Sequence, residues 1–125
     1  MKDFKTLTQI RNELNVSRKV IQGYEKHGLI RQYGKDAYGH LLYDEETYEK
    51  ITWIRFYQKL GFELNEIRVF IDRPLHDSSK IFEEKRNDLI RQADDLMKKS
   101  EILDDLAKGK TLERETILRI VKEEE

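Results

Sequence analysis

The feature that most constrains the fold of this chain is a long stretch, residues 80–108, that contains neither glycine nor proline. A helix over this stretch would be about 43 Å long. Apolar residues recur along it at heptad spacing, although small or polar residues occupy the alternate core positions. Because such a narrow apolar stripe must pack against a partner, most simply a second copy of the chain, we predict a homodimer. The predicted interface comprises Phe82, Leu89, Ala93, Leu96 and Leu103.

The remaining residues have room for one compact domain. Charged residues make up 39% of the 125 residues and the mean hydropathy is −0.81, so one buried core cannot extend over the whole length. The absence of cysteine excludes disulfides, thiolate metal sites and cysteine nucleophiles, and it is compatible with a reducing cytoplasm. No apolar run reaches the roughly 18 residues that a membrane span needs, so we expect a cytoplasmic protein that makes no membrane contact.

Charge is distributed unevenly along the chain. Residues 1–43 carry eight Lys and Arg against four Asp and Glu, whereas residues 76–125 carry eleven against fourteen. This asymmetry is expected if only the N-terminal part of the chain meets phosphate groups.

Two short helices are predicted near the N-terminus. The first is expected to begin at Thr8, and a tight break at Asn15 follows it. Ser17 is the predicted N-cap of the second helix, which runs to about His27 and is ended by Gly28. Because the second helix is basic on its outer face, the pair is typical of a helix-turn-helix.

The segments that follow predict a wing and further helices. Aromatic residues beside glycines in 30–43 indicate a β-hairpin. Asp44 is the predicted N-cap of a third helix, and Glu63 begins a fourth that stops at Pro74. After the long helix, Thr111 is the predicted N-cap of a last short helix.

Three segments resemble the MerR family of bacterial transcription regulators. Residues 16–30, VSRKVIQGYEKHGLI, resemble the family's recognition helix, V-S-x-x-T-[LI]-R-Y-Y-E-x-x-G-L-[IL]. Residues 39–43, GHLLY, resemble the wing pattern G-Y-R-x-Y, and residues 54–67, IRFYQKLGFELNEI, resemble F-I-x-x-x-x-x-L-G-F-S-L-x-E-I. The three segments occur in the family's order, and together they cover about residues 5–73.

The resemblance implies a mainly α fold with a winged helix-turn-helix head over 1–75, an antiparallel coiled-coil dimerisation helix over 76–108 and a tail helix over 109–125. It implies a homodimer that binds a near-palindromic operator in double-stranded promoter DNA and distorts the promoter spacer so that RNA polymerase can engage both promoter elements. Three possibilities are left for the signal that controls such a regulator: a small organic ligand, no effector at all, or an autoregulatory tail helix.

Predicted DNA contacts come from the second helix, the hairpin and the third helix. Side chains in the first turn of a recognition helix reach base edges or phosphates, and a lysine at a wing tip suits phosphate or the minor groove. For Gln22, His40 and the third-helix pair, simple solvent exposure is an equally good interpretation, and Tyr24 can equally cover the core. The predicted residues are Ser17, Arg18, Lys19, Gln22, Tyr24, Lys35, His40, Arg55 and Lys59.

The chain departs from the family pattern at three positions. Gln22 and Leu41 stand where the family usually has arginine, and Gly23 stands where it has tyrosine. Losing two phosphate partners should weaken the attraction to DNA and flatten its dependence on salt. A second hypothesis is therefore that the chain is a protein-interaction module that has lost strong DNA binding.

No other type of functional site is predicted. The histidines at 27, 40 and 76 share no metal-ligand spacing, and no nucleophile, phosphate-loop or triad pattern is present, so we expect no metal, no cofactor and no enzymatic activity. The helical spacing of Tyr48, Trp53 and Phe56 favours packing in the core over a ligand cage.

Overall fold

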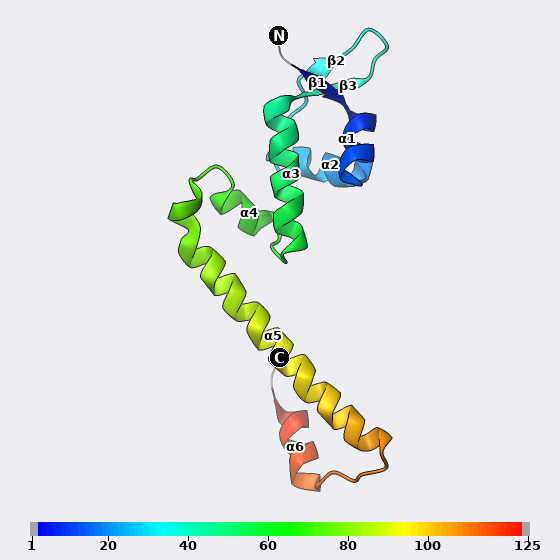
Figure 1. Ribbon diagram of the computed structural model, residues 1–125, viewed down its shortest axis with the longest axis vertical. Coiled ribbons are helices and arrows are strands. Elements are labelled where there is room, and N and C mark those ends of the chain that lie inside the picture. The colour runs from blue at the N-terminus through cyan, green and yellow to red at the C-terminus, as the bar shows by residue number, and fades with distance from the viewer. Residues whose placement is uncertain (1–2, 124–125) are drawn as a thin grey trace. The chain divides into compact units, whose positions relative to one another are not determined.

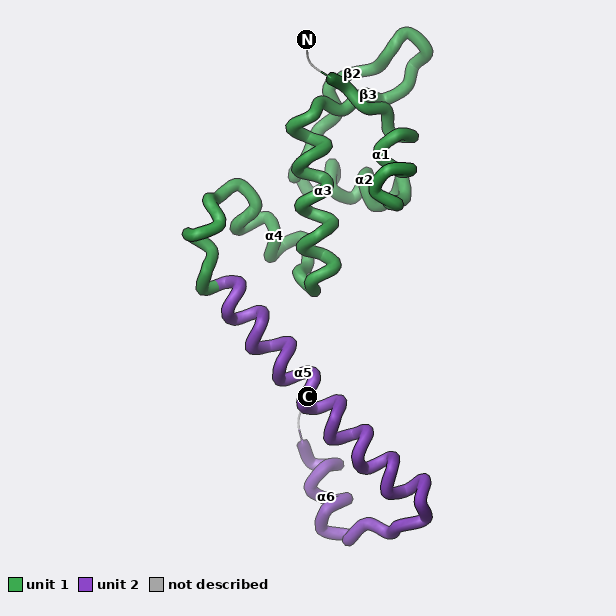
Figure 2. Tube along the Cα trace, in the orientation of Figure 1, with its two compact units in different colours: residues 1–80 green, residues 81–125 purple. Residues whose placement is uncertain are grey.

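The computed structural model describes residues 3–123, and the chain divides into two compact units, residues 1–80 and 81–125 (Figure 2). The first unit combines a small sheet with short helices, and the second consists mainly of one long helix (Figure 1). Within residues 3–123, no helix has both the length and the apolar character that crossing a bilayer requires.

The helix-turn-helix is formed by α1 (Leu7–Leu14) and α2 (Arg18–Lys26). Asn15 turns the chain between them with a φ of 52°. The predicted cap of α2 is confirmed, because the Ser17 side chain accepts a hydrogen bond of 3.2 Å from the Val20 N–H. Gly28, with a φ of 72°, follows the C-terminus of α2, as predicted.

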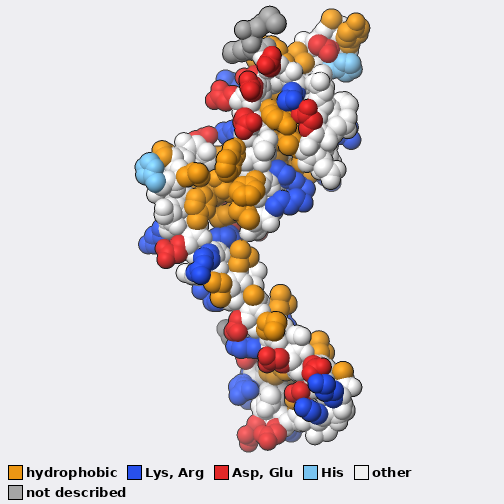
Figure 3. Space-filling view, viewed as in Figure 1, with side chains coloured by type: hydrophobic (Ala, Val, Ile, Leu, Met, Phe, Trp, Pro, Cys, Tyr) orange, Lys and Arg blue, Asp and Glu red, His pale blue; other side chains and the backbone are white. Residues whose placement is uncertain are grey.

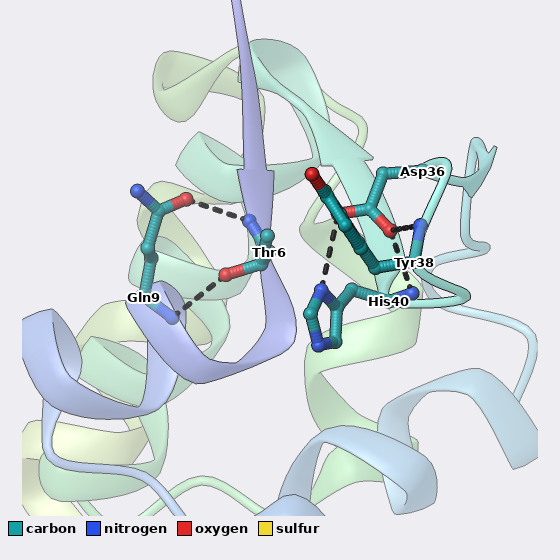
Figure 4. Close-up of polar contacts among 5 residues, drawn as sticks. All are labelled: Thr6, Gln9, Asp36, Tyr38 and His40. Carbon is teal, nitrogen blue, oxygen red and sulfur yellow. Dashed lines mark hydrogen bonds and ion pairs between the residues drawn. The ribbon is translucent and has the colours of Figure 1, made fainter.

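The predicted start of the first helix was wrong by two residues. Thr6, not Thr8, is the N-cap of α1, and its hydroxyl accepts from the Gln9 N–H at 3.2 Å while the Gln9 side chain accepts from the Thr6 N–H at 2.8 Å (Figure 4). This reciprocal pair satisfies two helix N–H groups. Thr6 is favoured because a glutamine lies three residues after it.

The predicted hairpin is confirmed, and it belongs to a three-stranded antiparallel sheet in the order β1-β3-β2. Strand β3 (Leu41–Asp44) pairs with β2 (Gly34–Lys35) on one side and with β1 (Phe4–Thr6) on the other. Strand β1 was not predicted, because three residues are too few to show an alternating pattern.

Helix α3 (Glu45–Lys59) and helix α4 (Leu64–Phe70) follow the sheet, and a 3₁₀ turn (Leu75–Ser78) comes after α4. The predicted cap of α3 is confirmed by the Asp44 carboxylate, which accepts from the Thr47 N–H at 2.8 Å. The predicted cap of α4 is also confirmed, because Glu63 and Glu66 form a capping box.

The core of the first unit lies between the helices and the sheet. Its fully buried aliphatic and aromatic side chains are Ile10, Ile21, Tyr24, Tyr43, Ile51, Ile54, Ile67 and Phe70. Two aromatic residues expected in this core lie at its edge, since Trp53 is 43% and Phe56 49% exposed. The apolar face of α3 is wider than its own unit covers, and Figure 3 shows an apolar patch over the region of α4.

The second unit contains α5 (Ser79–Ala107), apart from its first two residues, and α6 (Arg114–Lys122). The long helix is confirmed, but α6 begins after Glu113 rather than at Thr111, which lies in the irregular segment that precedes the helix. Neither helix has a buried residue in the single chain, and Leu96 and Leu103 are 63% and 64% exposed. The mainly α fold with a small winged head agrees with the sequence-based prediction.

Candidate nucleic-acid interface

The outer face of α2 is polar and exposed, whereas its inner face is buried. Arg18, Lys19 and Gln22 are exposed, and Ile21 and Tyr24 pack in the core. The first turn contains no acidic residue, so nothing in it neutralises the positive end of the helix. The helix therefore presents two cations and an amide beside a positive dipole end, a combination that suits phosphate oxygens and the acceptor groups of bases.

A shared hydrogen-bond acceptor joins α2 to α3. The Tyr24 hydroxyl donates to Gln58 Oε1, and Arg55 Nη1 donates to the same oxygen at 3.4 Å. Burial raises the pKa of Tyr24, and the charge of Arg55 opposes that shift. The structure thus brings two predicted site residues together, and it places the Tyr24 ring in the core with its hydroxyl already bonded.

A second buried tyrosine joins α2 to the sheet. The hydroxyl of Tyr43, in β3, donates to the carboxylate of Glu25, in α2. Burial, followed by this carboxylate, raises the pKa of Tyr43, and the charge of Arg18 acts in the opposite direction. Arg18 is therefore within electrostatic reach of the bond that fixes α2 against the sheet.

The C-terminus of α2 is held by a third element. The guanidinium of Arg68, in α4, donates to the carbonyl oxygen of His27, which follows the last residue of α2. A cation at this end of a helix also complements the negative end of its dipole. Helix α2 is consequently anchored by side chains from β3, α3 and α4.

The wing tip, residues 36–40, connects β2 to β3 and is closed by one carboxylate (Figure 4). Asp36 Oδ1 accepts from the N–H groups of Tyr38 and His40, each at 2.9 Å. Asp36 Oδ2 lies 3.1 Å from Nδ1 of His40. Gly39 takes a φ of 81°, a left-handed conformation that the turn requires and that residues with a Cβ atom disfavour. Lys35 and His40 are both exposed on this hairpin.

Acid is expected to loosen the wing tip. The pKa of Asp36 is held below its ordinary value mainly by the hydrogen bond from the His40 N–H. The Tyr38 N–H and the His40 ring lower it further, and desolvation opposes the shift. The pKa of Asp36 is lower in the folded protein than in the unfolded chain, so its ionised carboxylate stabilises the turn fully above the ordinary pKa of aspartate. This stabilisation is lost as the pH falls through the lowered pKa.

This loosening can be followed by the amide resonances of Tyr38 and His40 below about pH 5, where free aspartate titrates. They should shift as Asp36 is protonated, and the same resonances in an Asp36→Asn variant should lack that titration. Equal titrations in both proteins would contradict the role given to the carboxylate.

The remaining predicted residues have simpler settings. Ser17 uses its side-chain oxygen to cap α2, and Lys59 is exposed in the last turn of α3. Asp36 and Tyr38, in the wing, and Gln58 and Arg68, which hold α2, were not predicted. An aspartate two residues before an exposed tyrosine in a glycine-containing turn is a local signal for the first pair. The other two act across 34 and 41 residues of sequence, and no local pattern indicates them.

A helix-turn-helix whose second helix has a basic outer face, followed by a β-hairpin, defines a winged helix-turn-helix DNA-binding protein. The family model described as the MerR HTH family regulatory protein matches residues 5–73, and the model described as MerR, DNA binding matches residues 48–106. The chain belongs to the MerR family, whose members are DNA-binding transcription regulators and not enzymes.

Individual proteins agree with this assignment. The chain is 28% identical over 104 residues to the mercuric resistance operon regulatory protein of Bacillus cereus, a match that covers 78% of the chain and 79% of that protein. It is 27% identical over 98 residues to the HTH-type transcriptional activator mta of Bacillus subtilis (strain 168); that match covers 78% of the chain but only 35% of the activator.

The fold is also similar to that of HiNmlR, a MerR family regulator lacking the sensor domain, which was crystallised bound to promoter DNA. The TM-score is 0.60 at 18% identity, over 86% of this chain and 92% of that one. Among residues 3–123, no group of three or more His, Asp or Glu side chains is placed to hold a metal ion.

Proposed function

We propose that the chain acts as a homodimer that binds a near-palindromic operator in double-stranded promoter DNA and regulates transcription from that promoter. The observation that carries this proposal is the outer face of α2, where Arg18, Lys19 and Gln22 are exposed on a helix anchored from three sides. A rigid helix with such a face suits the major groove. Lys35, His40, Arg55 and Lys59 would add contacts outside the groove.

Dimerisation is proposed to occur through α5. In the single chain its apolar stripe is left open to solvent at Leu89, Leu96 and Leu103. A helix with no buried residue gains most from a partner of the same kind. We accordingly assign DNA binding to residues 1–75, dimerisation to 76–108 and an accessory tail helix to 109–125.

The proposed action is on promoter shape. Two heads joined by one dimerisation element would contact both half-sites, and the contacts would offset the cost of deforming the spacer between them. RNA polymerase would then be affected through the DNA rather than by direct contact. No thiolate can bind an effector metal in a chain without cysteine, so the candidates for the signal are a small organic ligand, no effector at all, or an autoregulatory tail helix.

Footprinting of the purified protein on the DNA upstream of its own gene tests the proposal. A protected site with two inverted half-sites is expected at moderate salt. Sedimentation of the same preparation should show a dimer. If no site is protected at any salt concentration at which the protein stays dimeric, the hypothesis of a protein-interaction module replaces this one. The absence of arginine at positions 22 and 41 would then reflect the loss of DNA binding.

Restoring the two arginines of the family pattern is expected to tighten DNA binding. In a Gln22→Arg/Leu41→Arg variant, two phosphate contacts of about 0.7 kcal/mol each would give roughly tenfold higher affinity at low salt. The slope of log K against log salt should steepen by about two. An Asn65→Arg/Thr111→Arg variant adds the same charge at exposed sites outside the proposed interface. Equal gains in both variants would show that net charge alone is responsible.

A further inference from the structure

The wing tip displays one aromatic side chain to solvent. Tyr38 is 86% exposed, the most exposed of the large apolar side chains that the structure describes. Its ring centroid lies 6.3 Å from that of His40, with a tilt of 39° between the rings. By contrast, Tyr33 of the same hairpin is 58% exposed, and its ring lies 4.5 Å from that of Phe4.

The turn that carries Tyr38 is ordered by its own hydrogen bonds. The Asp36 N–H donates to the His40 carbonyl at 2.9 Å, and the Gly39 N–H donates to the Asp36 carbonyl at 3.1 Å. The Asp36 carboxylate adds its bonds to the N–H groups of Tyr38 and His40. A side chain displayed on a turn that is already ordered loses little conformational entropy when it binds, and tyrosine has only two rotatable side-chain angles to fix.

The charges of the hairpin identify the kind of partner. Across residues 31–43, Asp36 is the only acidic residue, and Arg31 and Lys35 are cationic. The Asp36 carboxylate is directed into the turn, where two N–H groups and the imidazole face it (Figure 4). An exposed phenol on a hairpin that also carries two cations, with its one anion turned inward, suits the sugar-phosphate backbone of DNA.

We propose that Tyr38 is a DNA-contacting residue of the wing, with its ring packed on a deoxyribose at the edge of the minor groove and its hydroxyl donating to a phosphate oxygen. Asp36 is the positioning residue that sets the direction of Tyr38. This inference rests on the proposed function and extends it to two residues outside the recognition helix. It also predicts that Tyr38 contributes affinity without a charge, so that its own contribution is insensitive to salt, unlike that of Lys35.

Substitution of Tyr38 tests the contact on the footprinted operator. A Tyr38→Ala variant should bind about tenfold more weakly and Tyr38→Phe about threefold more weakly, because the first loses ring and hydroxyl and the second only the hydroxyl. The salt slope should stay unchanged in both, whereas Lys35→Ala should reduce it by about one. Tyr33→Phe is the matched control, and its affinity should equal that of the wild type.

The role of Asp36 is tested by a double-mutant cycle. If Asp36 were only an anion near DNA, Asp36→Ala would remove repulsion and strengthen binding. As a positioning residue it should instead weaken binding, and by little or nothing when Tyr38 is already alanine. Amide spectra of Asp36→Ala should show changes confined to residues 34–42, which would establish that the variant folds.

The outcomes separate this inference from the proposed function. A missing wild-type footprint overturns the proposed function and this inference together. A wild-type footprint with unchanged affinity of Tyr38→Ala overturns this inference alone. Unchanged affinity with reduced promoter activity would assign Tyr38 to a protein partner and would also overturn it.

Discussion

A Leu96→Glu substitution is expected to convert the protein to a monomer and to weaken its binding to the operator by about 100-fold or more. Leu96 is 63% exposed in the single chain, so the glutamate meets solvent there and the fold is retained. In the proposed dimer the same carboxylate would be buried in an apolar seam without a partner, which costs several kcal/mol. Loss of the dimer removes the second half-site, and linkage of two sites contributes about 10² to 10⁴ in affinity.

Asn87→Glu is the matched control, because it adds the same charge to α5 at an exposed position outside the predicted interface. It should leave both dimerisation and DNA affinity near their wild-type values. Analytical ultracentrifugation and DNA titration check the two properties, and the thermal unfolding of the first unit should be the same in both variants. A Leu96→Glu variant that stays dimeric would exclude this seam as the interface.

The elements that were predicted correctly are those whose signals are local. Ser17 and Asp44 precede their helices in positions where a side-chain oxygen can accept from the N–H three residues later, and both do so. Gly28 provides the positive φ that ends α2. A heptad pattern without glycine or proline is sufficient to predict α5.

The parts that were not predicted depend on contacts distant in sequence or on competition between similar signals. Thr6 and Thr8 are both suitable caps, and only the glutamine at position 9 favours Thr6. The side chains of Gln58 and Arg68 hold α2 from helices that follow it by more than thirty residues. Periodicity places Trp53 on the apolar face of α3, but it gives no measure of how much of that face is covered.

The three contacts that anchor α2 affect how much DNA affinity is lost through the absence of arginine at positions 22 and 41. A recognition helix fixed by Tyr43, Gln58 and Arg68 is already ordered before DNA arrives, so little of its binding energy is lost in ordering. In the proposed complex, such preorganisation would offset part of the affinity lost because glutamine and leucine, not arginine, stand at positions 22 and 41. We therefore expect the remaining cations of α2 to account for a larger share of binding than they would beside two further arginines.

Replacing the two cations in the first turn of α2, in an Arg18→Ala/Lys19→Ala variant, is accordingly expected to weaken operator binding by about 100-fold or more. A bidentate contact to a base edge contributes roughly 1–3 kcal/mol, and both side chains lie in the first turn of the helix proposed to enter the major groove. The salt slope should decrease by about two if both contact phosphate and by less if one reads a base.

Arg73→Ala/Lys80→Ala is the control, because it removes the same charge from exposed positions outside the helix-turn-helix and the wing. It should change affinity by less than about threefold. Since the charge of Arg18 acts on the hydrogen-bonded Tyr43–Glu25 pair, thermal unfolding of both variants must be measured as well. If the two double variants lose affinity equally, attraction by net charge alone is sufficient, and α2 would not be the element that recognises the operator.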